Sequence, residues 1–130
     1  MIEVQSMFPV MVTPQLDAVK EFYETHFGFT TAFYEKEFYL HLVSSNGAVQ
    51  LGFLMPGHPT QPDFLHPQMN PDGYVISLEV QDAEKAYDVA KSESLTISQP
   101  LKEEVWGQYH FMVTDPSGIQ VDIVQNIDPQ

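Results

Sequence analysis

The most reactive side chains in this sequence are two carboxylates and one imidazole, Glu79, Asp122 and His110, which all fall within predicted strands. A carboxylate beside an imidazole can take a proton from a bound molecule and return it, which is general acid–base chemistry. On this hypothesis Glu79 or Asp122 is the general base and His110 is its partner. If the two carboxylates share one cavity they repel each other, and a cationic ligand would relieve that repulsion.

Metal-binding and nucleophilic chemistry finds less support in the residue types. The sequence has no cysteine, which excludes disulfides, a thiolate nucleophile and cysteine-ligated metals. Among its five histidines, none has the H-x-x-x-H spacing that places two imidazoles on one helix face. For His41 and His110, both in predicted strands, a partly buried structural role is the simpler interpretation.

The elements that position His110 and Asp122 are a predicted strand, a tight turn and a second strand. Residues 106–114 are rich in aromatic and β-branched side chains, which favour a strand. The segment Asp115–Gly118 predicts the turn, because its proline fixes φ, its aspartate can bond the backbone ahead and its glycine accepts a positive φ. Residues 119–125 then alternate between apolar and mixed faces, with Asp122 on the mixed face.

The remaining elements follow from the spacing of apolar residues and from capping residues. A helix is predicted over residues 17–27, with Asp17 as its N-cap and Gly28 as its C-cap, and a second helix begins after an N-cap at Asp82. Residues 55–72 are rich in proline and cannot form a helix or a central strand. Further strands are predicted over residues 6–13, 29–35, 38–44, 48–54, 73–80 and 95–103.

This order gives two copies of one βαβββ unit and therefore predicts an α+β fold, in which a cup is formed by mixed sheets. At 130 residues the chain fits one domain. Within it we distinguish a first module (1–54), a Pro-rich connector (55–72) and a second module (73–130). Each module has one helix for four strands, so one face of each sheet lacks a helix. Whether the connector is a linker or a flap over the cup stays open.

The faces that line the predicted cup form an apolar wall with a few polar groups, the usual composition of a small-molecule pocket. His110 lies two residues before Met112 in the same predicted strand and would therefore join the lining. Trp106 opens this strand and would lie at the mouth of the cup, where its aromatic ring favours a cation. In the alternative, the apolar members simply fill the space as core. Strand alternation assigns to this lining Phe8, Val10, Val12, Gln50, Val75, Ser77, Glu79, Met112 and Asp122.

The charge of the chain limits its partners. Five basic and eighteen acidic residues give a net charge of −13, which argues against nucleic acid and anionic membrane surfaces. The negative charge favours solubility; a more specific interpretation is that it attracts a cationic ligand. The sequence shows neither a signal peptide nor an apolar run long enough to span a bilayer. We therefore expect a cytoplasmic protein without a membrane partner.

Two stretches of the sequence resemble the vicinal oxygen chelate superfamily, which includes glyoxalase I, extradiol dioxygenases, fosfomycin-resistance transferases and bleomycin-resistance proteins. They are LDAVKEFYETHFGF, residues 16–29, and WGQYHFMVTDPSGIQVDIVQ, residues 106–125. The resemblance extends over nearly the whole chain. It implies the glyoxalase/bleomycin resistance fold of two βαβββ modules, and a homodimer, because the cups of these proteins often form between two chains.

The metal-dependent members hold one divalent ion with histidine and glutamate residues from the first and last strands of each module. The resemblance places these positions on Phe8, Gln50, Val75 and Asp122, or on Tyr74 in place of Val75 if the register shifts by one residue. Phe8 and Val75 have no donor atom, a neutral Gln50 is a poor ligand for a transition metal, and only Asp122 is anionic. The resemblance therefore implies a site without metal, similar to that of bleomycin-resistance proteins.

Several functional hypotheses follow. In the first, the protein has no cofactor and binds, as a homodimer, a hydrophobic or cationic small molecule such as an antibiotic, which it sequesters. In the second, Gln50 and Asp122 hold one divalent metal ion in a non-standard site of a glyoxalase, lyase or dioxygenase-type enzyme. A metal-free lyase or isomerase with Glu79, His110 and Asp122 as its catalytic residues is the third, and a structural or interaction role is the fourth. The sequence leaves open whether the protein is an enzyme.

Overall fold

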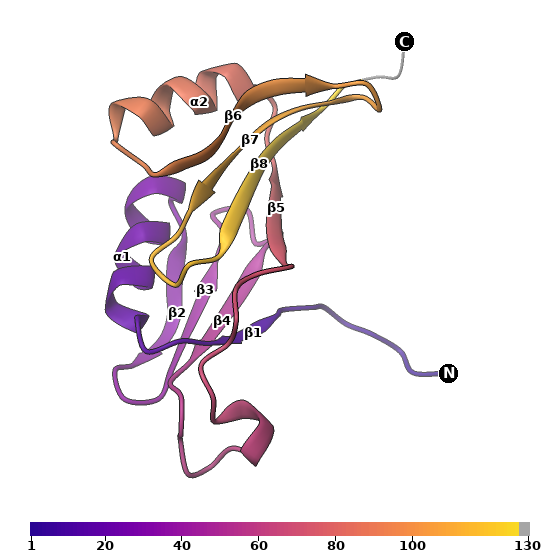
Figure 1. The fold of residues 1–130 in the computed structure, drawn as a ribbon. Helices are drawn as coiled ribbons and strands as arrows, with labels where there is room; N and C mark the ends of the chain where they lie inside the picture. Colours follow the sequence, from indigo (N-terminus) through magenta and orange to yellow (C-terminus); the bar gives the residue numbers. More distant parts are fainter. Residues whose placement is uncertain (128–130) are drawn as a thin grey trace. The chain divides into compact units, whose positions relative to one another are not determined.

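The computed structural model describes residues 1–127 and divides into two compact units, Met1–Asn70 and Pro71–Gln130 (Figure 1). Each unit contains one four-stranded mixed sheet and one α-helix. This arrangement confirms the predicted α+β fold of two βαβββ units. Neither α-helix within residues 1–127 is long and apolar enough to cross a membrane.

The first unit consists of β1 (Val10–Val12), α1 (Leu16–Phe27), β2 (Thr30–Glu35), β3 (Tyr39–Val43) and β4 (Gln50–Leu54). The order of strands in its sheet is β1-β4-β3-β2, with β1 parallel to β4 and the other neighbours antiparallel. The helix α1 packs on β3 and β2. The hairpin predicted from the two aromatic runs at 29–35 and 38–44 is therefore confirmed as β2 and β3.

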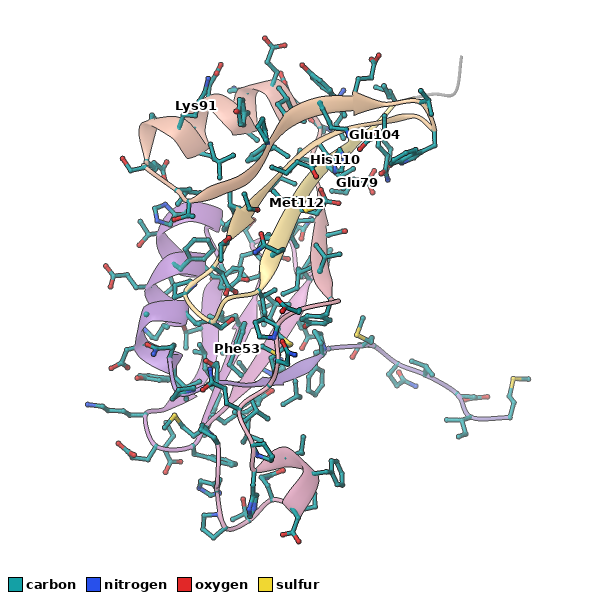
Figure 2. All side chains as sticks on the ribbon, in the orientation of Figure 1. Phe53, Glu79, Lys91, Glu104, His110 and Met112 are labelled. Carbon is teal, nitrogen blue, oxygen red and sulfur yellow. The ribbon has the colours of Figure 1, made fainter. Side chains whose placement is uncertain are left out.

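Apolar side chains at helical spacing hold α1 against this sheet. The ring of Tyr23 in α1 lies 6.0 Å from the ring of Phe53 in β4, and both side chains are fully buried. Figure 2 shows Phe53 within this unit. Each such burial contributes roughly 1.5–3 kcal/mol to folding. Because residues alternate along a strand, the side chains of Tyr39 and His41 lie on the opposite face, away from the helix. The buried helix-facing set is Leu16, Val19, Phe22, Tyr23, Leu40, Leu42, Leu51 and Phe53.

The start of β1 and the start of α1 both differ from the predicted boundaries. The strand predicted over residues 6–13 is limited to Val10–Val12, since Pro9 has no N–H and offers the sheet only its carbonyl oxygen. The helix begins at Leu16, so the N-cap prediction for Asp17 is wrong, and this residue lies in the first helical turn. A carboxylate there is still favourable next to the helix N-terminus. The C-cap prediction is confirmed, with Gly28 at φ 67°.

Residues 55–72 contain one short 3-10 helix, Asp63–Leu65 (η1), and no α-helix or strand, as their prolines predict. Backbone hydrogen bonds nevertheless fix the course of this segment. The N–H of Met69 donates to the carbonyl oxygen of Val12 at 2.9 Å, which ties the segment to the end of β1. The segment is therefore ordered irregular structure.

The second unit repeats the same order with β5 (Val75–Glu79), α2 (Ala83–Ser92), β6 (Ile97–Glu104), β7 (Gln108–Thr114) and β8 (Gln120–Asn126). Its strand order is β5-β8-β7-β6, with β5 parallel to β8. The helix α2 packs on β6, β7 and β8 (Figure 1). Asp82 is confirmed as its N-cap, because the side chain accepts a hydrogen bond from the Lys85 N–H at 3.0 Å.

The tight turn between β7 and β8 is built around the buried carboxylate of Asp115. Its Oδ1 atom accepts hydrogen bonds from the N–H of Ser117 at 2.8 Å and from the N–H of Ile119 at 3.1 Å. Gly118 adopts a φ of 92°, which favours glycine. The predicted turn is therefore confirmed. It sets the register in which Met112 of β7 lies opposite Asp122 of β8.

Alternation along these strands separates a helix-facing side from the face away from α2, which we call the non-helix face of the second sheet. Ile76 and Leu78 of β5 are buried on the helix side, and Val75, Ser77 and Glu79 lie on the other face, as the alternation predicts, where they are exposed. The prediction that Trp106 opens the strand over residues 106–114 is wrong. β7 begins at Gln108, and Trp106 lies in the turn before it, where Gly107 has a φ of 99°.

Candidate functional site

Three titratable side chains form a hydrogen-bonded row on the non-helix face of the second sheet. The Nδ1 atom of His110 lies 2.7 Å from Oδ1 of Asp122, and its Nε2 atom lies 2.8 Å from Oε2 of Glu104. His110 is 5% exposed and Asp122 is 7% exposed. The hydroxyl of Ser77 donates to the other oxygen of Asp122 at 3.2 Å. We call Glu104, His110 and Asp122 the histidine–carboxylate cluster; Figure 2 shows Glu104 and His110 on their strands.

The cluster stabilises a protonated imidazole. Ionised carboxylates only accept hydrogen bonds, so both ring nitrogens of His110 must carry a proton to satisfy both partners. Burial disfavours this charge, but the hydrogen bonds and the attraction of Glu104 and Asp122 outweigh burial and raise the pKa of His110. The hydrogen bond from His110 in turn holds the pKa of Glu104 below its usual value, with a smaller contribution from Lys102, whose Nζ lies 3.3 Å away. The cluster thus favours the protonated form of His110 and the ionised form of Glu104.

The sequence prediction brought Asp122 and His110 to one face correctly, but it paired them with Glu79. The structure places Glu79 in an exposed position at the end of β5 and brings Glu104 from β6 to the imidazole instead. Asp122 is not left without partners, since His110 and Ser77 both bind it. Glu104 was missed because the strand predicted here ended at residue 103.

Met112 and Val75 lie on the same face in different surroundings, and Trp106 lies in the turn before β7. Met112 is half-buried beside Asp122, its cross-strand partner. Val75 is 44% exposed, so it does not fill a core. The indole N–H of Trp106 donates to the side-chain oxygen of Gln108 at 2.9 Å, while the ring remains 62% exposed. This turn therefore presents an aromatic ring next to the strand that carries Glu104.

The non-helix face of the first sheet carries a second polar row. The hydroxyl of Tyr39 lies 2.8 Å from Nδ1 of His41, and Nε2 of His41 lies 2.7 Å from Oε1 of Gln50. The ring of Phe8 meets the imidazole edge-on at a centroid distance of 4.8 Å. Gln50 and Phe8 were predicted on this face, whereas Tyr39 was not.

The two valines predicted beside Phe8 have different roles. Val10 is 41% exposed and lies opposite Gly52 on the edge strand β1. Val12 is almost fully buried, so it belongs to the core of the first unit. Val10 and Val12 have the same parity in β1, but only Val10 is open to solvent.

A separate hollow of about 230 Å³ lies at the N-terminal end of α1. Its charged lining residues are exposed, and none of the predicted site residues borders it. It is therefore not part of the candidate site. The lining consists of Pro14, Gln15, Leu16, Asp17, Ala18, Lys36, Glu37 and Met55.

The paired βαβββ units, each with one sheet face free of helix, define the architecture that the sequence resemblance implied. The chain belongs to the Glyoxalase/Bleomycin resistance protein/Dioxygenase superfamily, whose family model matches residues 7–123. A search of the curated proteins finds no match to the sequence.

Solved structures agree on the fold. A lactoylglutathione lyase from Agrobacterium tumefaciens has a TM-score of 0.75 at 16% sequence identity, covering 95% of this chain and 94% of that one. A glyoxalase/bleomycin resistance protein/dioxygenase from Nocardioides has a TM-score of 0.77 at 16% identity, covering 100% and 88%. A superfamily member from Sphaerobacter thermophilus has a TM-score of 0.74 at 20% identity, covering 95% and 98%. At these identities the likeness shows the fold alone.

The residues at the superfamily's metal positions do not fit a divalent ion. Phe8 and Val75 have no donor atom, the side-chain oxygen of Gln50 contacts His41, and both oxygens of Asp122 accept hydrogen bonds. Within residues 1–127, no three His, Cys, Asp or Glu side chains are grouped so that they could hold a metal ion. In the histidine–carboxylate cluster the two carboxylates bind opposite nitrogens of one ring, so their donor atoms do not converge on a shared point.

Proposed function

We propose that this protein is a metal-independent small-molecule-binding member of its superfamily, which sequesters a hydrophobic or cationic organic compound such as an antibiotic. The observation that carries the proposal is the engagement of both ring nitrogens of His41 and of His110 by side chains of their own unit, at 2.7–2.8 Å. An imidazole binds a metal only through a free nitrogen lone pair. A metal would therefore have to displace hydrogen bonds that are already satisfied.

The ligand-binding surfaces in this proposal are the non-helix faces of the two sheets. Each presents exposed apolar side chains next to hydrogen-bonding groups, with Phe8 and Val10 on the first unit and Val75 and Trp106 on the second. This mixture is typical of small-molecule sites. The net charge of −13 raises the local concentration of cations, and an exposed indole attracts them further.

The proposed oligomeric state rests on the superfamily, and the proposed compartment and partners rest on the composition of the chain. Superfamily members typically form dimers, and we propose a homodimer here. The strong negative charge supports a protein that stays in solution in the cytoplasm and binds neither nucleic acid nor anionic membranes. In this proposal residues 1–54 and 73–130 act as the two modules of one domain, and residues 55–72 connect them.

Calorimetric titration of benzyltrimethylammonium, an aromatic cation, at low ionic strength tests the proposal. We expect binding that is stronger than that of neutral benzyl alcohol and that weakens in Glu104→Gln. The matched control is Glu103→Gln, which removes the same charge from an exposed neighbour. Glu103 lies opposite Tyr109 in the sheet, and its side chain points to the other face from that of Glu104. Absence of binding for both compounds would contradict a binding role for these faces. Equal losses in the two variants would show that only net charge matters.

A metal-free acid–base enzyme is the second candidate, because the partly exposed carboxylate of Glu104 lies 2.8 Å from Nε2 of His110, which places a carboxylate base next to an imidazole. In this candidate the partly exposed carboxylate of Glu104 takes a proton from carbon next to a carbonyl, and the substrate becomes an enolate. Solvent then returns a proton to the same carbon. Deuterium incorporation into hydroxyacetone in D₂O, lost in Glu104→Gln, would favour this candidate over simple binding, and exchange at the uncatalysed rate would exclude it for this substrate class.

A further inference from the structure

The row formed by Tyr39, His41 and Gln50 has a defined direction. Because the side-chain oxygen of Gln50 is an acceptor, the Nε2 atom of His41 must donate the hydrogen bond that joins them at 2.7 Å. A neutral imidazole carries only one N–H, so its Nδ1 atom has a lone pair. The Tyr39 hydroxyl must then be the donor in the 2.8 Å contact with Nδ1. The row therefore runs from Tyr39 through His41 to Gln50.

This direction leaves the phenol oxygen of Tyr39 as an acceptor. A phenol has one proton and two lone pairs, and the proton is committed to His41. Burial also raises the pKa of the Tyr39 phenol, so the group stays protonated at neutral pH. No acidic or basic side chain other than His41 belongs to this row, so its polarity does not depend on a neighbouring charge. Any polar contact that Tyr39 makes outward is one in which it accepts a hydrogen bond.

Gly52 fixes the position of the phenol. A Cβ atom built on Gly52 would overlap the Tyr39 hydroxyl and lie 3.0 Å from the ring carbon that bears it, so the ring lies directly across this residue of β4. The φ of Gly52 is not among the positive values, so its backbone conformation does not require glycine. Close approach of another group is the remaining reason for a glycine inside a strand. The absent side chain thus makes room for Tyr39.

Aromatic rings frame the acceptor on the same face. Phe33, which pairs with His41 across β2 and β3, has its ring centroid 6.3 Å from that of Tyr39 and is 47% exposed. Phe8 contacts His41 on the other side and is 45% exposed. Rings with half of their surface open are suited to stacking against a flat apolar molecule.

We propose that the non-helix face of the first sheet is a binding site for planar aromatic compounds with an O–H or N–H donor, and that Tyr39 selects them by accepting that hydrogen bond. The inference rests on the proposed small-molecule-binding function and names a ligand class for this face. His41 and Gln50 are positioning residues, because they act through Tyr39 rather than on the ligand.

The test compares 2-naphthol with 2-methoxynaphthalene, which has the same ring system but no donor, in binding to the full-length protein followed by NMR. We expect 2-naphthol to bind about three- to tenfold more tightly, the range of one net hydrogen bond. Tyr39→Phe should remove this preference while both compounds still bind. The matched control is Tyr34→Phe on β2. Tyr34 follows Phe33 directly, so its side chain points to the opposite face of the sheet, and this variant should keep the preference for 2-naphthol. His41→Gln, which removes the ring that orients the hydroxyl, should reduce it.

The results distinguish a failure of the role of Tyr39 from a failure of small-molecule binding in general. Equal binding of the two compounds by the wild-type protein would overturn the role of Tyr39 but leave small-molecule binding in place. Failure of both naphthalenes to shift resonances of the first unit would overturn the site, while the titration with benzyltrimethylammonium decides the proposed function independently. Spectra of each variant verify folding. If Tyr39→Phe does not fold, Gly52→Ala tests the same point by displacing the phenol, and an unchanged preference in Gly52→Ala would also overturn the role of Tyr39.

Discussion

Asp122→Ala is the substitution that tests the histidine–carboxylate cluster most severely. The Asp122 carboxylate accepts hydrogen bonds from His110 at 2.7 Å and from Ser77 at 3.2 Å, and the residue is 7% exposed. Removing one partner of a buried ion pair costs about 3–5 kcal/mol, and one hydrogen bond to a charged group contributes about 1.5–3 kcal/mol. Because Ser77 is exposed and Glu104 still holds the other nitrogen, we expect the free energy of unfolding to fall by about 3 kcal/mol.

The measurement is urea unfolding followed by circular dichroism, with two control variants. Asp122→Asn keeps an acceptor oxygen for His110 and should lose about 1 kcal/mol. Asp88→Ala removes a carboxylate that forms an exposed ion pair with Lys91 at 3.7 Å, and it should change stability by less than about 0.5 kcal/mol. The denaturant dependence should stay constant across the variants, which shows that the same surface unfolds in each.

The effect of Asp122→Ala also depends on pH in a direction that the cluster fixes. Since the pKa of His110 is raised in the folded protein, the stability that the cluster contributes is complete below the unfolded-state value for histidine, about 6.5, and is lost as pH rises through the folded-state value. The difference between wild type and Asp122→Ala should therefore be larger at about pH 6 than at about pH 9. A variant as stable as Asp88→Ala, or a difference independent of pH, would refute this account.

Two further predictions concern Glu104 and Gly52. In an NMR titration, Glu104→Gln should lower the pKa of His110, because it removes the carboxylate 2.8 Å from Nε2, whereas Glu103→Gln should leave it nearly unchanged; equal shifts would mean that the contact has no specific role. Gly52→Ala should cost about 1–3 kcal/mol in urea unfolding by overpacking against Tyr39, and in a Tyr39→Ala background that cost should largely disappear. Additive effects of these two substitutions would contradict the close approach of the phenol.

The shared face of His110, Asp122 and Ser77 could be predicted because local rules fix it. The Asp115 turn sets the register of β7 against β8, and the alternation of side chains then places both polar residues away from the helix. Parity on β5 added Ser77 by the same argument. These predictions needed only turn chemistry and a period of two residues.

The position of Glu104 could not be predicted in this way. The pairing of β6 with β7 shifts register twice, between Ile97 and Gln99 and again between Gln99 and Lys102, around a proline that cannot donate to the ladder. A period of two therefore fails along this strand. The role of Tyr39 could not be predicted for a different reason. Its ring lies across β4, and the one sequence feature that indicates this close approach is Gly52, a glycine within a strand. The cup between the two modules stays a prediction.

Elemental analysis of the purified protein, after incubation with Zn²⁺, Ni²⁺, Fe²⁺ or Mn²⁺ and gel filtration, tests metal independence most directly. We predict far less than one metal ion per chain, with benzyltrimethylammonium bound equally well before and after treatment with a chelator. One equivalent of a transition metal per chain, lost in Asp122→Ala or in Gln50→Ala and needed for ligand binding, would contradict it.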